Sequence, residues 1–196
     1  MSLVPIPAVI VAGGLARRMG GGDKMLRPLG TGTILSEILR RLGPQASPVA
    51  INANGDPARF AAFGLIVLPD PVEGRPGPLA GLLAAMEWAE RLGAREVLSV
   101  PGDAPFLPPD LLPRLRQAGA PAIASSGGRD HPVAGLWPSA LGAQLRDDLS
   151  GGLRRVLDFA DRQGARRVVF DLGAGGPDPF LNINTPEDLT KAASWL

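Results

Sequence analysis

Val-Ile-Val-Ala-Gly-Gly-Leu-Ala-Arg-Arg-Met-Gly-Gly-Gly-Asp-Lys, residues 9–24, is the stretch that decides the fold. A short apolar run ends at Gly13 and Gly14, and a loop with two arginines and three more glycines closes on Asp23 and Lys24. Glycine lets backbone N–H groups approach an anion closely, and cationic side chains offset its charge. The stretch therefore predicts a buried strand followed by a polyphosphate-binding loop, rather than a solvated surface turn.

The loop fits neither of two familiar phosphate-binding motifs. A Walker A loop requires Gly-x-x-x-x-Gly-Lys followed by Ser or Thr, whereas Lys24 is preceded by Asp23 and followed by Met25. The dinucleotide-binding fingerprint requires Gly-x-Gly-x-x-Gly at a helix start, whereas Gly13 and Gly14 are adjacent. A dinucleotide-dependent dehydrogenase is therefore disfavoured.

Composition narrows the class of protein. Of the 196 residues 45% are hydrophobic, which supports a core and predicts a single domain over residues 1–196. A net charge of +1 gives no global field for nucleic acid or an anionic membrane. The sequence has no cysteine, which excludes thiolate metal sites and fits a reducing compartment. We find neither a secretion signal nor a bilayer-spanning apolar run, so we expect a cytoplasmic protein.

Short apolar runs alternate with amphipathic stretches in the first half of the chain. The runs predict buried strands over residues 9–12, 49–52, 65–68 and 97–100. Apolar residues at helical spacing predict helices over 34–42, 58–63 and 79–92. This alternation is typical of an α/β fold, in which helices cover a largely parallel sheet and ligands bind at the carboxyl ends of its strands.

The second half is less regular. We expect strands over residues 120–125, 133–137, 167–171 and 180–183, and helices over 141–149 and 153–163. A last helix should follow Asn184 or Thr185, either of which can cap it, with Pro186 at its first position.

Asp103 comes three residues after the end of the predicted strand over residues 97–100, between Pro101 and Pro105. A carboxylate at a strand end can reach a metal ion bound to a triphosphate, and Mg²⁺ prefers one or two carboxylates together with phosphate oxygens and water. A helix N-cap is the structural alternative for such an aspartate, but Asp110 fits that role better. Asp103 is therefore the candidate ligand of a magnesium ion.

Asn52 lies at the end of the second predicted strand, and Asp70 follows the third. Turn formation explains either residue taken alone, because Asn and Asp favour such positions. Both nevertheless lie at strand carboxyl ends on the side of the glycine loop, where an amide and a carboxylate can contact a base edge or ribose hydroxyls.

Three polar residues in the second half are candidates for contact with a second substrate. His131 is the only histidine, so a three-histidine zinc site is impossible, and no nucleophile-elbow motif accompanies it. Asn182 and Asn184 alternate, so on a strand they would share one face, and paired amides suit the donor–acceptor edge of a heterocyclic ring. The alternatives are a polar hairpin tip for His131 and strand-end or capping roles for the asparagines.

In order and spacing, Ala12-Gly13-Gly14, Arg18-Met19-Gly20 and Asp23-Lys24 resemble the signature of nucleotidyltransferases that use nucleoside triphosphates. The form Arg-Arg-Met-Gly-Gly-x-Asp-Lys is most similar to that of the molybdenum cofactor guanylyltransferases, the molybdopterin-guanine dinucleotide biosynthesis protein A family. The closing Asn-x-Asn-Thr-Pro-Glu at residues 182–187 is also similar. The resemblance implies a three-layer α/β/α sandwich with a mainly parallel, Rossmann-like sheet, of the nucleotide-diphospho-sugar transferase type.

The resemblance also implies site residues. It assigns the metal to Asp103, the acceptor to Asn182, Asn184 and His131, and the nucleotide to positions matching Val11, Ala12, Gly13, Gly14, Lys24, Asn52, Asp70 and Asp103. The family often has Cys-Asp-Thr-Pro around the metal-binding aspartate, whereas this chain has Gly-Asp-Ala-Pro at residues 102–105. The aspartate is kept, and only the groups around it differ.

The implied reaction is transfer of GMP from GTP to the terminal phosphate of molybdopterin, metal-loaded or bare, with release of pyrophosphate. Arg18 would neutralise the leaving pyrophosphate, Lys24 would neutralise charge at the α-phosphate, and Asp103 would hold Mg²⁺. Molybdoenzyme chaperones or other cofactor-biosynthesis proteins are the expected partners.

Two other functions stay open at this point. A related cytidylyltransferase acting on a molybdenum cofactor or on a sugar or polyol phosphate would share the loop and Asp103. A non-catalytic nucleotide-binding protein would keep the loop as a relic, although the joint presence of Arg18, Lys24 and Asp103 speaks against it.

Overall fold

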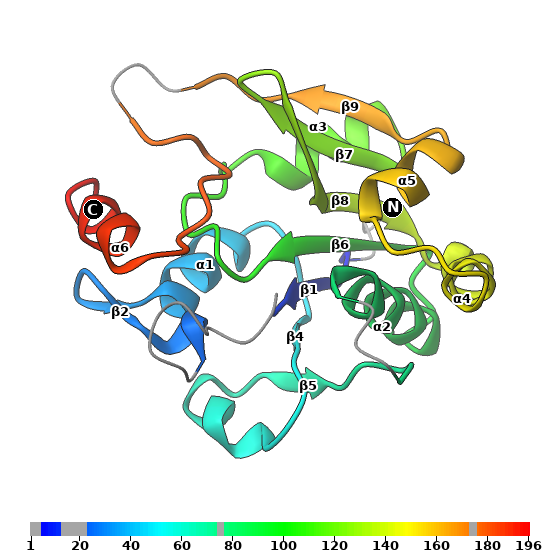
Figure 1. Cartoon of the computed structure of the whole chain (residues 1–196), viewed down its shortest axis with the longest axis horizontal. Coiled ribbons are helices and arrows are strands. Elements are labelled where there is room, and N and C mark those ends of the chain that lie inside the picture. The colour runs from blue at the N-terminus through cyan, green and yellow to red at the C-terminus, as the bar shows by residue number, and fades with distance from the viewer. Residues whose placement is uncertain (1–4, 13–22, 74–76, 173–175) are drawn as a thin grey trace.

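The computed structural model describes residues 5–12, 23–73, 77–172 and 176–196 (Figure 1). The predicted phosphate contacts of Gly13, Gly14 and Arg18 fall outside these ranges. Val11, Ala12, Lys24 and every other candidate site residue lie inside them.

A seven-stranded sheet in the order β5-β4-β1-β6-β8-β7-β9 forms the centre of the described structure. Its strands are β1 (Ala8–Val11), β4 (Val49–Asn52), β5 (Ile66–Leu68), β6 (Glu96–Pro101), β7 (Ala122–Ser126), β8 (Arg129–Pro138) and β9 (Arg166–Val169). Only β8 among them runs against its neighbours, β6 and β7. The other pairings are parallel, which confirms the mainly parallel sheet.

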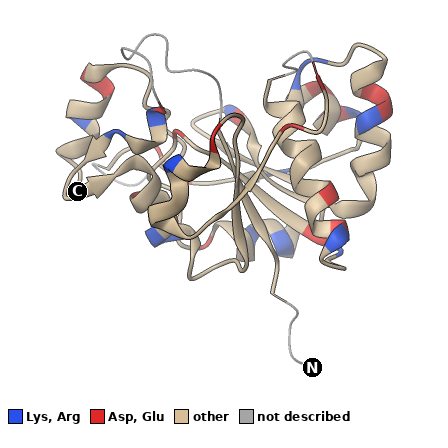
Figure 2. Ribbon diagram, turned by 90° about the horizontal axis from the view of Figure 1, so that it is seen from below, with Lys and Arg blue, Asp and Glu red and all other residues tan. Residues whose placement is uncertain are grey.

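Helices cover both faces of the sheet and complete the three-layer α/β/α sandwich (Figures 1 and 2). One apolar cluster contains residues of α1 (Ile34–Leu42), α3 (Leu111–Ala118) and α6 (Pro186–Ala193). The other contains residues of α2 (Pro78–Arg91), α4 (Gly142–Ser150) and α5 (Val156–Arg162). Shorter elements are the antiparallel pair β2 (Pro28–Leu29) and β3 (Gly32–Thr33) and the 3₁₀ helices η2 (Lys24–Leu26), η3 (Pro57–Phe63) and η4 (Ser139–Leu141).

The central strands have no solvent face. In β1, Val9 belongs to the cluster with α2, while Ile10 belongs to the cluster with α1. Ala50 and Ile51 divide between the same two clusters in β4. All four side chains are 0% exposed, which explains why these strands appear in the sequence as continuous apolar runs.

The structure corrects several predicted boundaries. The segment expected as a helix over 58–63 is the 3₁₀ helix η3, which runs from Pro57 to Phe63 and is capped by Gly64 with a left-handed φ of 63°. The helix expected over 153–163 begins only at Val156, because Gly151 and Gly152 form a turn, with a φ of 96° at Gly152, and residues 153–155 have no regular structure. Helix α3 was not predicted beyond its cap position, Asp110.

The strand expected over residues 180–183 is absent from the described segment. The segment is a loop, and its Ile183 N–H donates to the backbone oxygen of Asp103 at 2.9 Å. Asn182 and Asn184 therefore do not lie on a strand, and the expectation that their side chains share one face of it is wrong. Of the two proposed caps of the last helix, Thr185 is the N-cap, in a capping box with Asp188.

Candidate active site

The described candidate residues lie along one edge of the sheet, where the parallel strands end. Val11 stands opposite both Asn52 and Pro101 in the strand register, and Asn52 stands opposite Leu68. Strands β1, β4, β5 and β6 therefore end nearly level, so the residues that follow them meet. This edge is where open α/β sheets bind their ligands.

Lys24 lies at the centre of the site. Its Nζ donates to Asp103 Oδ2 at 2.9 Å and to Asn184 Oδ1 at 2.7 Å. The Lys24 side chain is 11% exposed and that of Asp103 is 21% exposed, so the ion pair is largely shielded but not sealed from solvent. The structure thus joins two residues assigned to the nucleotide and one assigned to the acceptor.

The position of Lys24 follows from the packing of its neighbour. Met25 is 4% exposed and lies against Gly102, where a Cβ would come within 2.4 Å of the Met25 sulfur. Gly102 itself is tied to β1, since its N–H donates to the Val11 oxygen at 2.9 Å. Gly102 therefore makes room for Met25, which sets Lys24 beside Asp103.

Asn52 and Asp70 form a hydrogen-bonded pair at the ends of β4 and β5. Asn52 is 3% exposed, and its Nδ2 donates to Asp70 Oδ1 at 2.9 Å and to the Leu68 oxygen at 3.1 Å. Asn54 completes the group: its Nδ2 donates to Asp70 Oδ2 at 2.7 Å, and its Oδ1 accepts from the Asp70 N–H at 2.9 Å. Both carboxylate oxygens of Asp70 are thus held by amides from the preceding strand end.

Helix α2 packs against this pair through Gly81. A Cβ at Gly81 would lie 2.4 Å from Asn52 Oδ1 and 2.6 Å from Val11 Cγ1. Gly81 therefore allows a close approach of helix α2 to strands β1 and β4 at the site.

Arg59 belongs to the site but could not be found from the sequence. Its Nε lies 2.7 Å from Asp23 Oδ2, off the N–H direction, so the contact is an ion pair rather than a hydrogen bond. The guanidinium also donates to the backbone oxygens of Asn54 and Asp56, and it lies over the Phe60 ring at 4.9 Å. Arg59 thereby connects the residue before Lys24 with the loop that carries Asn54.

The candidates on the acceptor side differ in what they contact. Asn182 is exposed, whereas Asn184 is bonded to Lys24. The backbone N–H groups of Asn184 and Thr185 donate to Asp188 Oδ2 at 2.9 Å each, and these bonds lower the pKa of Asp188. His131 is half-buried, with Nε2 2.7 Å from Ser126 Oγ and its ring stacked on Phe180.

The metal-binding prediction concerns a single carboxylate. Residues 5–12, 23–73, 77–172 and 176–196 contain no group of three or more His, Cys, Asp or Glu side chains placed to hold a metal ion. Asp103 would therefore need ligands from a substrate. This donor set suits Mg²⁺, which takes one or two carboxylates and completes its shell with phosphate oxygens and water.

Comparison with known proteins now adds the family. A family model described as the MobA-like NTP transferase domain matches residues 8–167. The chain belongs to this family. It is 50% identical over 199 residues to the molybdenum cofactor guanylyltransferase of Mesorhizobium japonicum. This alignment covers 97% of this chain and 96% of that protein. It is also 50% identical over 194 residues to the enzyme of the same name from Rhodopseudomonas palustris, which covers 95% and 91%.

Solved structures of MobA-like proteins share the fold. The molybdopterin-guanine dinucleotide biosynthesis protein A of Archaeoglobus fulgidus superposes with a TM-score of 0.71 at 20% identity, covering 96% of this chain and 97% of that one. A nucleotidyl transferase from Methanothermobacter thermautotroptrophicus gives 0.70 at 22% identity, covering 97% and 96%. The nucleotidyltransferase fold expected from the sequence is therefore confirmed.

The family model covers only part of the candidate site. Lys24, Asn52, Asp70 and Asp103 fall inside the matched range, whereas Asn182 and the segment around it follow its end. No helix of the described part is both long and apolar enough to cross a bilayer.

Proposed function

We propose that this chain transfers GMP from GTP to the terminal phosphate of molybdopterin, metal-loaded or bare, and releases pyrophosphate. One observation carries the proposal: the Lys24 ammonium lies between Asp103 and Asn184. Asp103 follows a strand end typical of nucleotide sites, and Asn184 belongs to residues 178–187, the closing segment. The names and high identity of the relatives support the same reaction.

The chemical difficulty is that a phosphate anion must attack the α-phosphorus of another anion. No protein nucleophile is required, because positioning and charge neutralisation lower the barrier. Lys24, which the Asp103 and Asn184 oxygens hold in place, would turn its charge toward the α-phosphate. Arg18 would neutralise the departing pyrophosphate, and the backbone from Val11 to Gly14 would donate N–H groups to the phosphates.

Asp103 would hold Mg²⁺ together with oxygens of the bound nucleotide. The ion would supply positive charge that offsets the developing negative charge on the phosphates. Asp103 is suited to this because its backbone is fixed on both sides, by the Gly102 N–H bond to Val11 and by the Ile183 N–H bond to its own oxygen.

The two substrates would be recognised on either side of Lys24. Asp70, oriented by Asn52 and Asn54, would accept hydrogen bonds from the nucleoside. Asn182 would contact the pterin from the exposed side of the closing segment, with Asn184 and His131 behind it. Molybdoenzyme chaperones or other cofactor-biosynthesis proteins would receive the product.

The test is pyrophosphate release by the purified chain with GTP, Mg²⁺ and molybdopterin, with identification of the dinucleotide product. Each substrate is also supplied alone, and CTP replaces GTP in a parallel series. Release only with the complete GTP set supports the proposal. A clear preference for CTP would instead identify a cytidylyltransferase, and nucleotide binding without release would identify a non-catalytic binder.

A further inference from the structure

Ser126 lies at the carboxyl end of β7 and is 0% exposed. Its hydroxyl oxygen is 2.7 Å from His131 Nε2, on β8, and 2.8 Å from Asp178 Oδ1, in the segment that leads to α6. A serine, a histidine and an aspartate are thus joined in one cluster, in which the proposed reaction gives no role to Ser126 or Asp178.

The order of these groups excludes a hydrolytic triad. An ionised carboxylate only accepts hydrogen bonds, so the Ser126 hydroxyl must donate to Asp178 and accept from His131 Nε2–H. In a triad the serine gives its proton to the histidine, which then contacts the aspartate. Here Ser126 occupies the middle position and its proton is committed to Asp178. The cluster therefore holds the chain in place instead of activating a nucleophile.

What the cluster holds is the start of the closing segment. Asp178 Oδ1 also accepts from the Phe180 N–H at 2.9 Å. Phe180 is 2% exposed, and its ring lies 4.7 Å from that of His131 and 5.4 Å from that of Phe170. The hydrogen bond from Ser126 to Asp178 and the ring contact between His131 and Phe180 therefore tie residues 178–180 to the β7–β8 hairpin, and Phe170 packs against the Phe180 ring as well.

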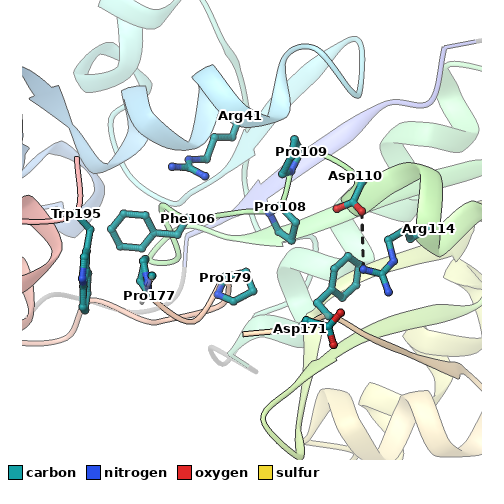
Figure 3. A pocket seen from close by; sticks show the side chains of 12 residues that line it. Arg41, Phe106, Pro108, Pro109, Asp110, Arg114, Asp171, Pro177, Pro179 and Trp195 are labelled. Carbon is teal, nitrogen blue, oxygen red and sulfur yellow. Dashed lines mark ion pairs between the residues drawn. The ribbon is translucent and has the colours of Figure 1, made fainter. Parts of the chain in front are cut away.

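The opposite side of this segment faces a pocket of about 370 Å³. Pro177 and Pro179 line it, together with Phe106 and Trp195 (Figure 3). Asp178, between the two prolines, contacts Ser126 on the other side. With open space behind the prolines, the Ser126 cluster supplies the polar anchoring of this stretch.

From Phe180 the chain reaches the proposed active site within four residues. The Ile183 N–H donates to the Asp103 oxygen, and Asn184 accepts from Lys24. The capping box of Thr185 and Asp188 fixes the far end. The exposed Asn182 lies between these two anchors, so its position depends on both.

We infer that Ser126 and Asp178, with His131, are positioning residues that hold residues 180–184 and thereby align the acceptor. The alignment of the acceptor rests on the proposed function, whereas the anchoring of residues 180–184 does not. Ser126→Ala should raise the KM for molybdopterin about tenfold, as expected for the loss of one well-placed hydrogen bond, while equilibrium binding of GTP with Mg²⁺ stays unchanged. Asp178→Asn, which retains an acceptor oxygen, should have a smaller effect.

Ser125→Ala is the matched control. Ser125 is the preceding residue of β7, is 8% exposed and donates to the Arg129 oxygen at 3.0 Å rather than to the closing segment. In a double-mutant cycle with Asn182→Ala, Ser126→Ala should be non-additive in the KM for molybdopterin, and Ser125→Ala should be additive.

Amide hydrogen exchange separates this inference from the proposed function. Ser126→Ala should speed exchange at Phe180 and Ile183 several-fold, and Ser125→Ala should not. If exchange at these amides is unchanged, the anchoring is refuted whatever the activity. If exchange rises but molybdopterin KM in an active enzyme stays within twofold of the control, the role in acceptor alignment is refuted. If exchange rises in a chain without transferase activity, the anchoring stands and the proposed function fails.

Discussion

Gly81 and Asn52 are in such close contact that the side chain of one excludes any side chain on the other. A Cβ at Gly81 would lie 2.4 Å from Asn52 Oδ1. Asn52 in turn donates to Asp70, so the surface of helix α2 determines where a carboxylate of the proposed nucleotide site lies.

Gly81→Ala should therefore displace Asn52. We expect a loss of about 1–3 kcal/mol in the free energy of unfolding, as for other overpacked sites, and a rise of about tenfold in the Kd for GTP with Mg²⁺. Denaturant unfolding and nucleotide titration measure the two effects. Gly142→Ala is the control, since a Cβ there would meet Met86 at an ordinary 3.4 Å. If Gly81→Ala leaves GTP binding unchanged, Asn52 has no role in binding the nucleotide.

Lys24→Ala and Asp103→Ala should each lower kcat by about a hundredfold to a thousandfold, because each removes a preorganised charge. The double variant should be little worse than the poorer single variant, since the two groups act as one pair. Steady-state pyrophosphate release gives these values, with Lys191→Ala as a cation control in α6. Near-normal transfer by Asp103→Ala at saturating Mg²⁺ would remove Asp103 from the metal site.

Arg59→Met should loosen Asp23 and hence the residue after it, Lys24. Both partners are about a quarter exposed, 27% and 28%, so we expect less than about 1 kcal/mol in stability. The larger effect should be a rise of about threefold to tenfold in the KM for GTP. Asp23→Asn should give the same change without adding to it in the double variant. Additive effects, or an equal change in Arg40→Met, would contradict the link.

The stability of the fold should fall as the pH drops below the ordinary histidine pKa of 6.5. Burial lowers the pKa of His131, against the attraction of Asp178 and Asp130 and with the repulsion of Arg129. Between its folded and unfolded pKa values the unfolded chain binds the extra proton, so stability there increases with pH. Below about pH 5 the carboxyl groups of Glu37 and Asp188, whose pKa values are lowered, begin to contribute.

Unfolding free energies of wild type and His131→Gln between pH 7 and 5 measure this effect. The curve of the variant should be flatter across this window, because Gln does not titrate. Parallel curves for the two proteins would show that His131 takes up its proton equally in both states.

The sequence was sufficient for the edge of the sheet. Apolar runs predict β1, β4 and β6, and parallel strands end at a common edge, so the placement of Asn52 and Asp103 at that edge could be predicted. Contacts across the chain were not predictable. Nothing in the sequence near Arg59 indicates Asp23, and nothing near Ser126 indicates Asp178, because these pairs exist only through tertiary packing.

The incorrect strand over residues 180–183 has a related cause. Alternation of apolar and polar residues is the usual signal of a half-buried strand. Here the buried positions, Phe180 and Ile183, are three apart, and one side chain packs on the hairpin while the backbone of the other bonds to Asp103. The period of the pattern was therefore misread.

The hydrogen bond from Lys24 to Asn184 joins the range matched by the family model to the segment that follows it. The residues proposed for phosphate chemistry lie within the range matched by the family, residues 8–167, whereas Asn182 and Asn184 come after it. The segment that carries the two asparagines is joined to the matched range by hydrogen bonds to Ser126, Asp103 and Lys24 and by the buried side chains of Phe180 and Ile183. In the proposed reaction, a substitution at Asn182 therefore changes acceptor preference and leaves the triphosphate contacts in place.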